Sequence, residues 1–315
     1  MSASNELHVQ SLGTALGSVR LNVLKDIVPL ADGRLAKYSK TGFENVYHSE
    51  RDVGLDVLAL SALGPPPHPT LTDVDYLIGV SSVSTAAPSW TYALTAKLGL
   101  RNDIRILSLQ DACTGFATGL ELAFNLVESN VAKKVLLVTV DHYSHFYDLD
   151  SDLAMLFSDG ASAFTVSREG ATHQEGKPAW WWSIMASAVC TEPGSQSALL
   201  ISNRRLEMHG AAVFQFALTA VPPLVRSVLR EANESMEISW FVHQGSRVVV
   251  DAVGQVLGLS QDELFRAQGY GNTVASSIPM QLQSTVRQPD GYLGLLSFGM
   301  GLTSRCMLIK ERAAS

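Results

Sequence analysis

The run Val135-Leu-Leu-Val-Thr-Val140 limits the possible folds of this chain more than any other feature. Its residues have high strand propensity and show no alternation of polar and apolar positions. A strand with one solvent-facing side would alternate, so this run predicts a strand in a sheet that is covered on both faces. Tyr76–Val80 has the same character, and 295–298 and 306–309 predict strands that flank a glycine-rich turn near the end of the chain.

Helical segments alternate with these strands. We expect helices over 51–63, ended by Gly64 and the proline-rich loop that follows, and over 90–100 and 248–257. A further helix over 213–229 should be interrupted at Pro222-Pro223. Strands that alternate with helices predict an α/β fold with parallel-dominated sheets and helices on both faces, with two halves that repeat the same pattern.

The length supports two units. A chain of 315 residues suits two fused units of roughly 150 residues each. The segment 168–178 is charged, contains glycine and lacks large apolar residues, so we place the seam there. The predicted halves are therefore residues 1–170 and 171–315, and 180–189 should open the second half as a strand.

Composition excludes several classes of protein. Hydrophobic residues make up 46% of the chain and charged residues 17%, which favours a well-buried globule over a disordered chain. Since no apolar run reaches 18 residues and the first residues do not resemble a signal peptide, we expect a cytoplasmic protein without a membrane span. The net charge of −7 without a basic stripe makes nucleic acid an unexpected partner. Three cysteines, 113, 190 and 306, form no disulfide framework.

Cys113 lies where the hydrophobic period changes. Ile104 and Ile106 alternate as in a strand, whereas Phe116, Leu120 and their neighbours share one helical face. A thiol at the first turn of a helix faces free N–H groups and the positive end of the helix dipole, which should lower its pKa and create a nucleophile. The alternative is a small apolar residue in a tight turn, and Cys113 alone does not decide between the two.

The second half contains candidate partners for this thiol. His243 follows a short strand, at the edge where open α/β sheets gather their sites. Asn272 lies in Tyr270-Gly-Asn-Thr273, and Ser297-Phe-Gly-Met-Gly-Leu-Thr303 has two glycines around Met300 that would let backbone N–H groups converge on one oxygen. Each feature also has a structural explanation, as a buried histidine, a turn asparagine and a hairpin. Together they indicate acyl chemistry.

In blocks that run in order from about residue 40 to 309, the chain resembles the β-ketoacyl-acyl-carrier-protein synthase III branch of the thiolase superfamily. The matching blocks are Lys40-Thr-Gly, Asp111-Ala-Cys-Thr-Gly-Phe116, Phe157-Ser-Asp-Gly-Ala161, Met208-His-Gly with Val213-Phe214, His243-Gln, Tyr270-Gly-Asn-Thr with Ala275-Ser-Ser-Ile-Pro279, and Phe298-Gly-Met-Gly301.

The resemblance implies a five-layered αβαβα core from two pseudo-repeated halves, usually in a homodimer. It also implies that Cys113 takes the acyl group, that His243 and Asn272 complete a triad, and that the backbone N–H groups of Cys113 and Met300 form the oxyanion hole. Further positions are implied to bind substrate, namely Lys40, Ala87, Phe214, Arg247, Gly299 and Gly301. No metal or resident cofactor is implied, because coenzyme A or carrier-protein thioesters are the substrates.

The chemistry of these groups favours condensation. A thiolate exchanges one thioester for another, and a malonyl-type partner that loses carbon dioxide then needs only hydrogen-bond donors at its enolate oxygen. An asparagine can donate but cannot act as a general base. Two alternatives stay open: an acyltransferase or hydrolase that uses the same acyl-enzyme, with a hydroxyl or amine as acceptor in the transfer case, and a non-catalytic partner subunit of a related synthase.

The chain departs from the family pattern where coenzyme A is gripped. Ala36 and Lys40 stand where the family has a tryptophan and an arginine. At a second position, which is basic in the family, this chain has Ser151 or Asp152. Val248 occupies the position of the arginine that docks the carrier, and Arg247 lies one place before it. Ala87 replaces an aromatic wall of the acyl pocket. We therefore expect a specialised pathway, a roomier pocket and a possible acyl carrier protein as partner. The pair His142 and His145 has a zinc-like spacing but lacks further ligands, so we expect no metal site.

Overall fold

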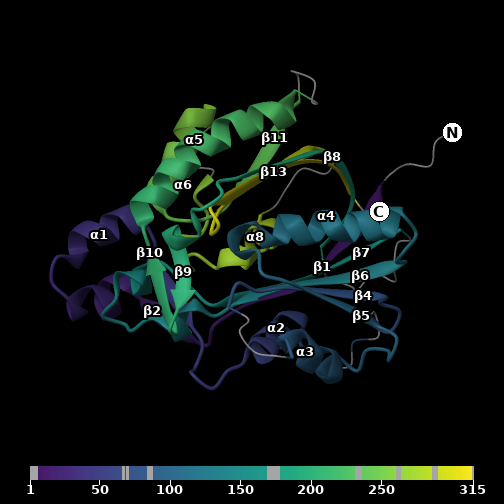
Figure 1. Ribbon diagram of the computed structural model, residues 1–315, viewed down its shortest axis with the longest axis horizontal. Coiled ribbons are helices and arrows are strands. Elements are labelled where there is room, and N and C mark those ends of the chain that lie inside the picture. The colour runs from purple at the N-terminus through teal and green to yellow at the C-terminus, as the bar shows by residue number, and fades with distance from the viewer. Residues whose placement is uncertain are drawn as a thin grey trace.

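Nine strands pair into one mixed sheet in the computed structural model, which describes residues 6–65, 68, 71–83, 88–168, 178–230, 236–259, 264–285 and 290–313 (Figure 1). The strand order is β11-β12-β13-β8-β1-β7-β6-β4-β5. The first half contributes β1 (Leu7–Leu16), β4 (Tyr76–Val80), β5 (Arg105–Leu109), β6 (Lys134–Asp141) and β7 (Gly160–Ser167). The second half contributes β8 (Ala179–Thr191), β11 (Ile238–Val242), β12 (Tyr292–Gly299) and β13 (Thr303–Ala313).

The two halves repeat one pattern of pairing. From β1 outward, β7 is antiparallel, β6 is antiparallel and β4 is parallel, and from β8 outward β13, β12 and β11 follow with the same directions. The first half adds the edge strand β5. β1 and β8 join the halves through an antiparallel pairing of Leu7–Gln10 with 179–182. The predicted duplication is therefore confirmed, and the seam at 170 stays a prediction, because 169–177 lie outside the described residues.

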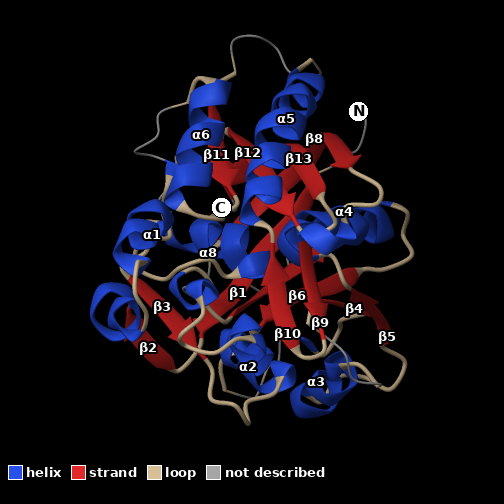
Figure 2. Ribbon diagram, turned by 60° about the vertical axis from the view of Figure 1, so that its left-hand side comes forward, coloured by secondary structure: helices blue, strands red, loops and turns tan. Residues whose placement is uncertain are grey.

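Helices form three layers around the two halves of the sheet (Figures 1 and 2). α2 (Leu55–Leu63) and α3 (Trp90–Leu98) cover the outer face of the first half, and α5 (Gly210–Leu229) and α6 (Arg247–Leu257) cover that of the second. α4 (Gly115–Glu128) and α8 (Ser277–Ser284) lie between the halves. The five layers αβαβα agree with the predicted fold class.

Strand β6 explains why its sequence is continuously apolar. Leu136 and Val138 belong to the outer core beneath α2, whereas Val135 and Leu137 belong to the inner core beside α4. Both faces are buried, so apolar residues predominate, and the hydroxyl of the polar Thr139 is hydrogen-bonded to Ser162 and Ser276. Gly119 of α4 lets the helix approach closely, because a Cβ there would lie 2.5 Å from Cδ1 of Leu137.

Helix α5 runs through Pro222 and Pro223 without a break, so the predicted interruption is wrong. The prolines remove two N–H donors, but Val221, Leu224 and Val225 are buried on the same helix, and this burial holds it together. α5 is also the one helix in the described part of the chain whose length and composition would suit a membrane span. This is weak evidence, because core helices pass the same test, and α5 packs on β13 and β8.

Two small pieces that the sequence did not predict lie beside the main sheet. One consists of β2 (Val19–Asn22), β3 (Asn45–His48), the short turns Val23–Ile27 and Val28–Leu30, and α1 (Arg34–Thr41). The other is the hairpin of β9 (Leu199–Ser202) and β10 (Arg205–Met208). Both contribute walls to the cavity described next.

Candidate active site

Cys113 lies in the sharp turn between β5 and α4. The turn is the 3-10 segment Ala112–Thr114, and Ala112 has a positive φ of 24°, which an alanine rarely adopts. The carboxylate of Asp111 accepts hydrogen bonds from the hydroxyls of Thr114, at 2.9 Å, and of Thr118. This side-chain clamp holds the strained turn, so Cys113 has a fixed position at the start of the helix.

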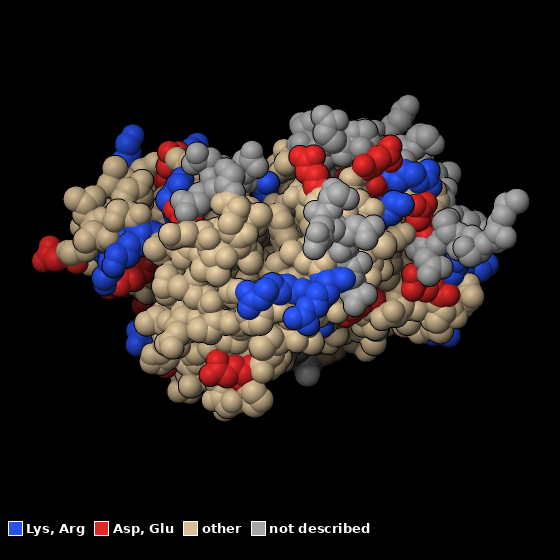
Figure 3. Space-filling model, turned by 90° about the horizontal axis from the view of Figure 1, so that it is seen from above, with Lys and Arg blue, Asp and Glu red and all other residues tan. Residues whose placement is uncertain are grey.

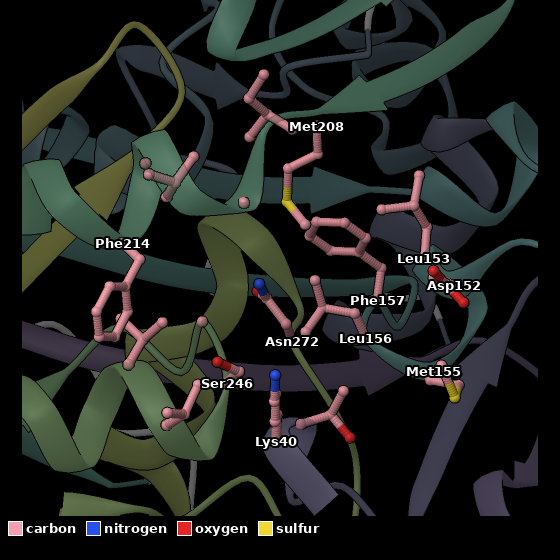
Figure 4. Close-up of a pocket in the computed structure, with 18 of the residues that line it drawn as sticks. Lys40, Asp152, Leu153, Met155, Leu156, Phe157, Met208, Phe214, Ser246 and Asn272 are labelled. Carbon is pink, nitrogen blue, oxygen red and sulfur yellow. The ribbon is translucent and has the colours of Figure 1, made fainter. Parts of the chain in front are cut away.

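The second half builds a similar turn at the start of α8. Val274 has a positive φ of 52° and begins the 3-10 segment Val274–Ser276. Asn272 precedes this turn, and its Oδ1 accepts a hydrogen bond of 2.9 Å from the N–H of Val274. Since the oxygen is occupied, the amide nitrogen is left as the free donor. Figure 4 shows this amide directed toward the space between Phe157 and Phe214.

Backbone bonds to the first half fix Asn272 further. Its N–H donates to the carbonyl of Leu156 at 3.0 Å, and its carbonyl accepts from the N–H of Ser158 at 2.8 Å. These bonds form an isolated parallel bridge between Phe157 and Asn272. The Phe157-Ser-Asp-Gly block therefore positions the asparagine from the opposite half.

His243 follows β11 and is buried. Its backbone N–H donates to the carbonyl of Leu296 at 2.8 Å, and its ring packs edge-on against Phe298, with centroids 5.6 Å apart. Burial lowers the pKa of His243 to about 3, so the imidazole is neutral at physiological pH. No described residue bonds Nδ1.

The Gly299-Met300 backbone passes directly beside the thiol. A Cβ on Gly299 would lie 2.7 Å from Sγ of Cys113, so only glycine fits there without a shift. The backbone N–H groups of Met300 and of Cys113 itself both act on the thiol and lower its pKa. Two backbone N–H groups from different halves of the protein thus approach the Cys113 sulfur. An oxyanion hole would need the same donors near the carbonyl oxygen of an acyl group attached there.

The net pKa of Cys113 is opposite to the sequence-based expectation. Burial and then the nearby carboxylate of Asp141 raise it to about 12, and the two N–H groups offset only part of this. The helix-start argument considered the dipole and omitted burial. Both causes favour the neutral thiol of Cys113 over the thiolate.

One cavity of about 540 Å³ connects the three side chains. Cys113, His243 and Asn272 all line it, together with an apolar wall and a mouth that carries the exposed side chains of Lys37, Lys40 and Asp152. Figure 4 shows Asn272, Lys40 and Asp152 around this cavity. The remaining lining residues are Thr41, Leu153, Met155, Leu156, Phe157, Leu199, Met208, Gly210, Ala211, Val213, Phe214, Gly245, Ser246, Val248, Val249, Phe298 and Gly299.

The predicted substrate-binding residues divide into two groups. Lys40, Phe214 and Gly299 line the cavity. Arg247 does not, because its guanidinium lies over the ring of Phe265, 4.5 Å from the centroid.

Gly301 is also absent from the cavity wall, and its carbonyl accepts a hydrogen bond of 2.7 Å from the Ser195 hydroxyl. Ala87 lies outside the described residues.

Sequence reasoning missed much of the wall. Met155 ends the short 3-10 helix Asp152–Met155 and Leu156 follows it, in a segment too short to show a hydrophobic period. Leu199 and Met208 belong to a hairpin that the sequence did not predict. The buried carboxylate of Asp141, at the end of β6, was also missed. The polar residue that ends an otherwise apolar strand was the available signal.

The rings of His142 and His145 lie side by side, with centroids 4.1 Å apart and planes tilted by 34°. Burial lowers the pKa of His142 to about 4. Within the described residues no group of three or more histidine, cysteine or acidic side chains is placed to hold a metal ion.

The surface charges are mixed in sign. On the face shown in Figure 3, lysine, arginine, aspartate and glutamate side chains are interspersed.

Comparisons with known proteins agree with this architecture. Residues 107–180 match the family model for 3-oxoacyl-[acyl-carrier-protein (ACP)] synthase III, and 230–311 match the model for its C-terminal part. A β-ketoacyl-[acyl-carrier-protein] synthase III of Chlamydia pneumoniae is 30% identical over 250 residues, which cover 72% of this chain and 74% of the relative. One of Synechocystis is 26% identical over 342 residues, with 96% and 98% covered.

Solved structures show the same fold. The 3-oxoacyl-(acyl carrier protein) synthase III of Pseudomonas aeruginosa PAO1 superposes with a TM-score of 0.81 at 27% identity, covering 98% of this chain and 99% of that one. The fold and these likenesses define a thiolase-like condensing enzyme as the class of protein. The chain belongs to the 3-oxoacyl-[acyl-carrier-protein] synthase III family.

Proposed function

We propose that this protein condenses an acyl group held on Cys113 with a malonyl-type or β-ketoacyl thioester, and that His243 and Asn272 stabilise the enolate. The observation that carries the proposal is that these three side chains, drawn from both halves of the fold, line one largely apolar cavity. The N–H groups of Met300 and Cys113 supply the oxyanion hole.

In the first step Cys113 is acylated. Its sulfur attacks the thioester carbonyl, and the oxyanion that forms is held by the two N–H groups. Collapse breaks the bond from carbon to the donor sulfur, and the donor leaves as a thiol with the proton that Cys113 has lost. The proton passes from the Cys113 sulfur to the leaving donor sulfur, because a histidine whose pKa burial lowers to about 3 is a weak base.

In the second step a malonyl-type thioester loses carbon dioxide. The electron pair of the broken C–C bond becomes an enolate, whose oxygen accepts hydrogen bonds from the imidazole N–H and the Asn272 amide. The enolate carbon then attacks the acyl carbonyl, and the bond to Cys113 breaks. The sulfur leaves as a thiolate and takes a proton from solvent, which restores the thiol. A neutral histidine suits this step, since it keeps an N–H donor without a charge to desolvate.

The lowered pKa of His243 favours condensation over transfer to a hydroxyl or amine. Such a transfer needs a base that takes a proton from the hydroxyl or ammonium group of the acceptor, and an imidazole whose pKa is about 3 does this poorly. Decarboxylation needs no base, and its enolate needs only donors. This argues against the acyltransferase alternative without invoking any group outside the cavity.

The Asn272→Ala variant tests this assignment. Loss of an enolate donor should cost about 2–4 kcal/mol of transition-state stabilisation, a few hundred-fold in rate, and leave acylation of Cys113 intact. The measurements are intact mass for acylation and carbon dioxide release for condensation, with Asn125→Ala, an exposed asparagine of α4, as the control. Normal product from Asn272→Ala, with no carbon dioxide released by the wild type, would favour acyl transfer.

We propose further that at least one substrate arrives on a carrier protein. At the mouth of the cavity Lys37 is paired with Asp152, and Nε of Arg34 lies 3.6 Å from the same carboxylate. Asp152 thus offsets positive charge where a nucleotide's phosphates would need it. Lys40 is exposed at the mouth and Ala36 offers no ring for an adenine, so a phosphopantetheine arm, with one phosphate, suits this mouth better than coenzyme A.

A role in a specialised pathway, a location in the cytoplasm and a homodimeric assembly complete the proposal. The edge strand β5 pairs only with β4 among the described strands, which leaves one of its edges for a second copy. Light scattering on the purified protein measures the assembly directly, and a monomeric mass would contradict the dimer.

A further inference from the structure

A fully buried carboxylate lies beneath the active site and takes no part in the steps above. Asp141 ends β6, and its Oδ1 accepts hydrogen bonds from the N–H of Ser82, at 2.9 Å, and the Ser82 hydroxyl, at 2.6 Å. Its Oδ2 accepts from the N–H of Ala275 at 3.3 Å. Within the described part of the chain, no lysine or arginine forms an ion pair with Asp141. Burying such a group is costly, so its retention calls for a reason.

Asp141 connects the two halves at the level of the proposed triad. Ser82 follows β4 in the first half, and Ala275 lies in the turn that starts α8 in the second. The residue before Ala275, Val274, donates the hydrogen bond that orients the Asn272 amide. Asp141 therefore anchors the turn that presents Asn272 to the cavity.

The negative charge of Asp141 also raises the pKa of the Cys113 thiol. After burial, the charge of Asp141 is the largest cause that raises the pKa of Cys113, ahead of Asp111. The titratable groups around Cys113 are these two carboxylates, Tyr143 and, across the cavity, His243.

Asp141 itself has few titratable neighbours. It faces Cys113, Tyr143 and Asp159. Burial raises the pKa of Asp141 to about 7, so its charge is fully developed only above neutral pH.

We propose that Asp141 is a positioning residue: its hydrogen bonds to Ser82 and Ala275 hold the turn that aims the Asn272 amide at the enolate. The inference rests on the proposed function, because it assigns Asn272 to the condensation step.

The Asp141→Asn variant tests the positioning, with acylation of Cys113 followed by intact mass and condensation followed by carbon dioxide release. Asparagine keeps the size of the side chain but places an N–H₂ group among donors, so a hydrogen bond from Ser82 or Ala275 is lost. The variant should acylate like the wild type and condense at least about tenfold more slowly, because a displaced Asn272 amide no longer meets the enolate. Asp103→Asn, an exposed carboxylate that pairs with Arg101, is the control. Condensation by Asp141→Asn at the rate of this control would overturn the proposal.

A second variant and a comparison with the wild type complete the test. Asp141→Ser, which is neutral and smaller, is used where Asp141→Asn does not yield folded protein. Loss of acylation and condensation in parallel would mean a purely structural role and would overturn the proposal. A wild type that neither acylates Cys113 nor releases carbon dioxide would contradict the proposed function, whereas a wild type and an Asp141→Asn variant that perform both steps equally would contradict this inference alone.

Discussion

Replacing Gly299 by alanine tests the geometry around the nucleophile with the smallest possible change. The new Cβ would lie 2.7 Å from Sγ and 2.8 Å from Cβ of Cys113, well inside van der Waals contact. Either β12 or the turn that carries Cys113 must move, and overpacking of this kind costs about 1–3 kcal/mol of stability. The displaced Met300 N–H should cost roughly 10²–10³ in the rate of acylation.

Single-turnover acylation followed by intact mass gives the rate, and urea denaturation gives the stability. Gly269→Ala is the control, because a Cβ there meets nothing within 4 Å and the backbone is not left-handed. Adding Cys113→Gly to Gly299→Ala removes both clashing atoms and should restore most of the lost stability. A Gly299→Ala protein with wild-type stability and acylation rate would refute the described placement of Cys113 against β12.

Two further predictions concern the histidine and the mouth of the cavity. Because burial lowers the pKa of His243 from 6.5 to about 3, the unfolded chain binds a proton there between these pH values and the folded protein does not, so this residue destabilises the fold as pH falls. From pH 7.5 to 5.0 the wild type should therefore lose about 2 kcal/mol of unfolding free energy relative to His243→Gln. Asp141, whose raised pKa has the opposite effect on stability, is present in both proteins, so its contribution cancels in the comparison. An equal pH dependence of the two proteins would contradict the burial of His243. The same acyl group presented on coenzyme A and on a pantetheine-like thiol should react at similar rates, and more slowly than on a cognate carrier protein. A much faster coenzyme A ester, slowed by Lys40→Ala, would show that the nucleotide is gripped.

The strands were predictable because the sheet is buried on both sides. The run 135–140 is apolar except for Thr139, because α2 covers one face of β6 and α4 covers the other. Such a run can be recognised without knowledge of its neighbours. The period change at Cys113 was equally local. Ala112 and the clamp of Asp111 carry no such signal, because their strain appears only in the folded turn.

The rest of the site depends on contacts between distant segments. Asn272 is oriented by Val274 and held by Leu156 and Ser158, more than 100 residues earlier in the chain. Arg247 could be placed on a helix but not aimed, and its guanidinium stacks on Phe265 instead of facing the cavity. Side-chain direction at such positions follows from packing that no spacing rule encodes.

The electrostatics show the same limit. A helix-start argument predicts a lowered pKa for Cys113, but full burial and the carboxylate of Asp141, a strand end in the same half, outweigh the dipole. Pro222 and Pro223 give a similar lesson for helices, since burial of α5 maintains a segment that local propensity would break. In both cases tertiary burial decides the outcome.

The most direct test of the account is intact-mass analysis of wild-type and Cys113→Ala protein after incubation with a panel of acyl thioesters. We predict that a suitable thioester adds one acyl mass to the wild type, that a malonyl-type partner then discharges it with release of carbon dioxide, and that Cys113→Ala shows neither event. Cys190→Ala serves as the control, because Cys190 is a free thiol that does not line the cavity. Acylation and turnover by Cys113→Ala at the wild-type level would contradict the central claim.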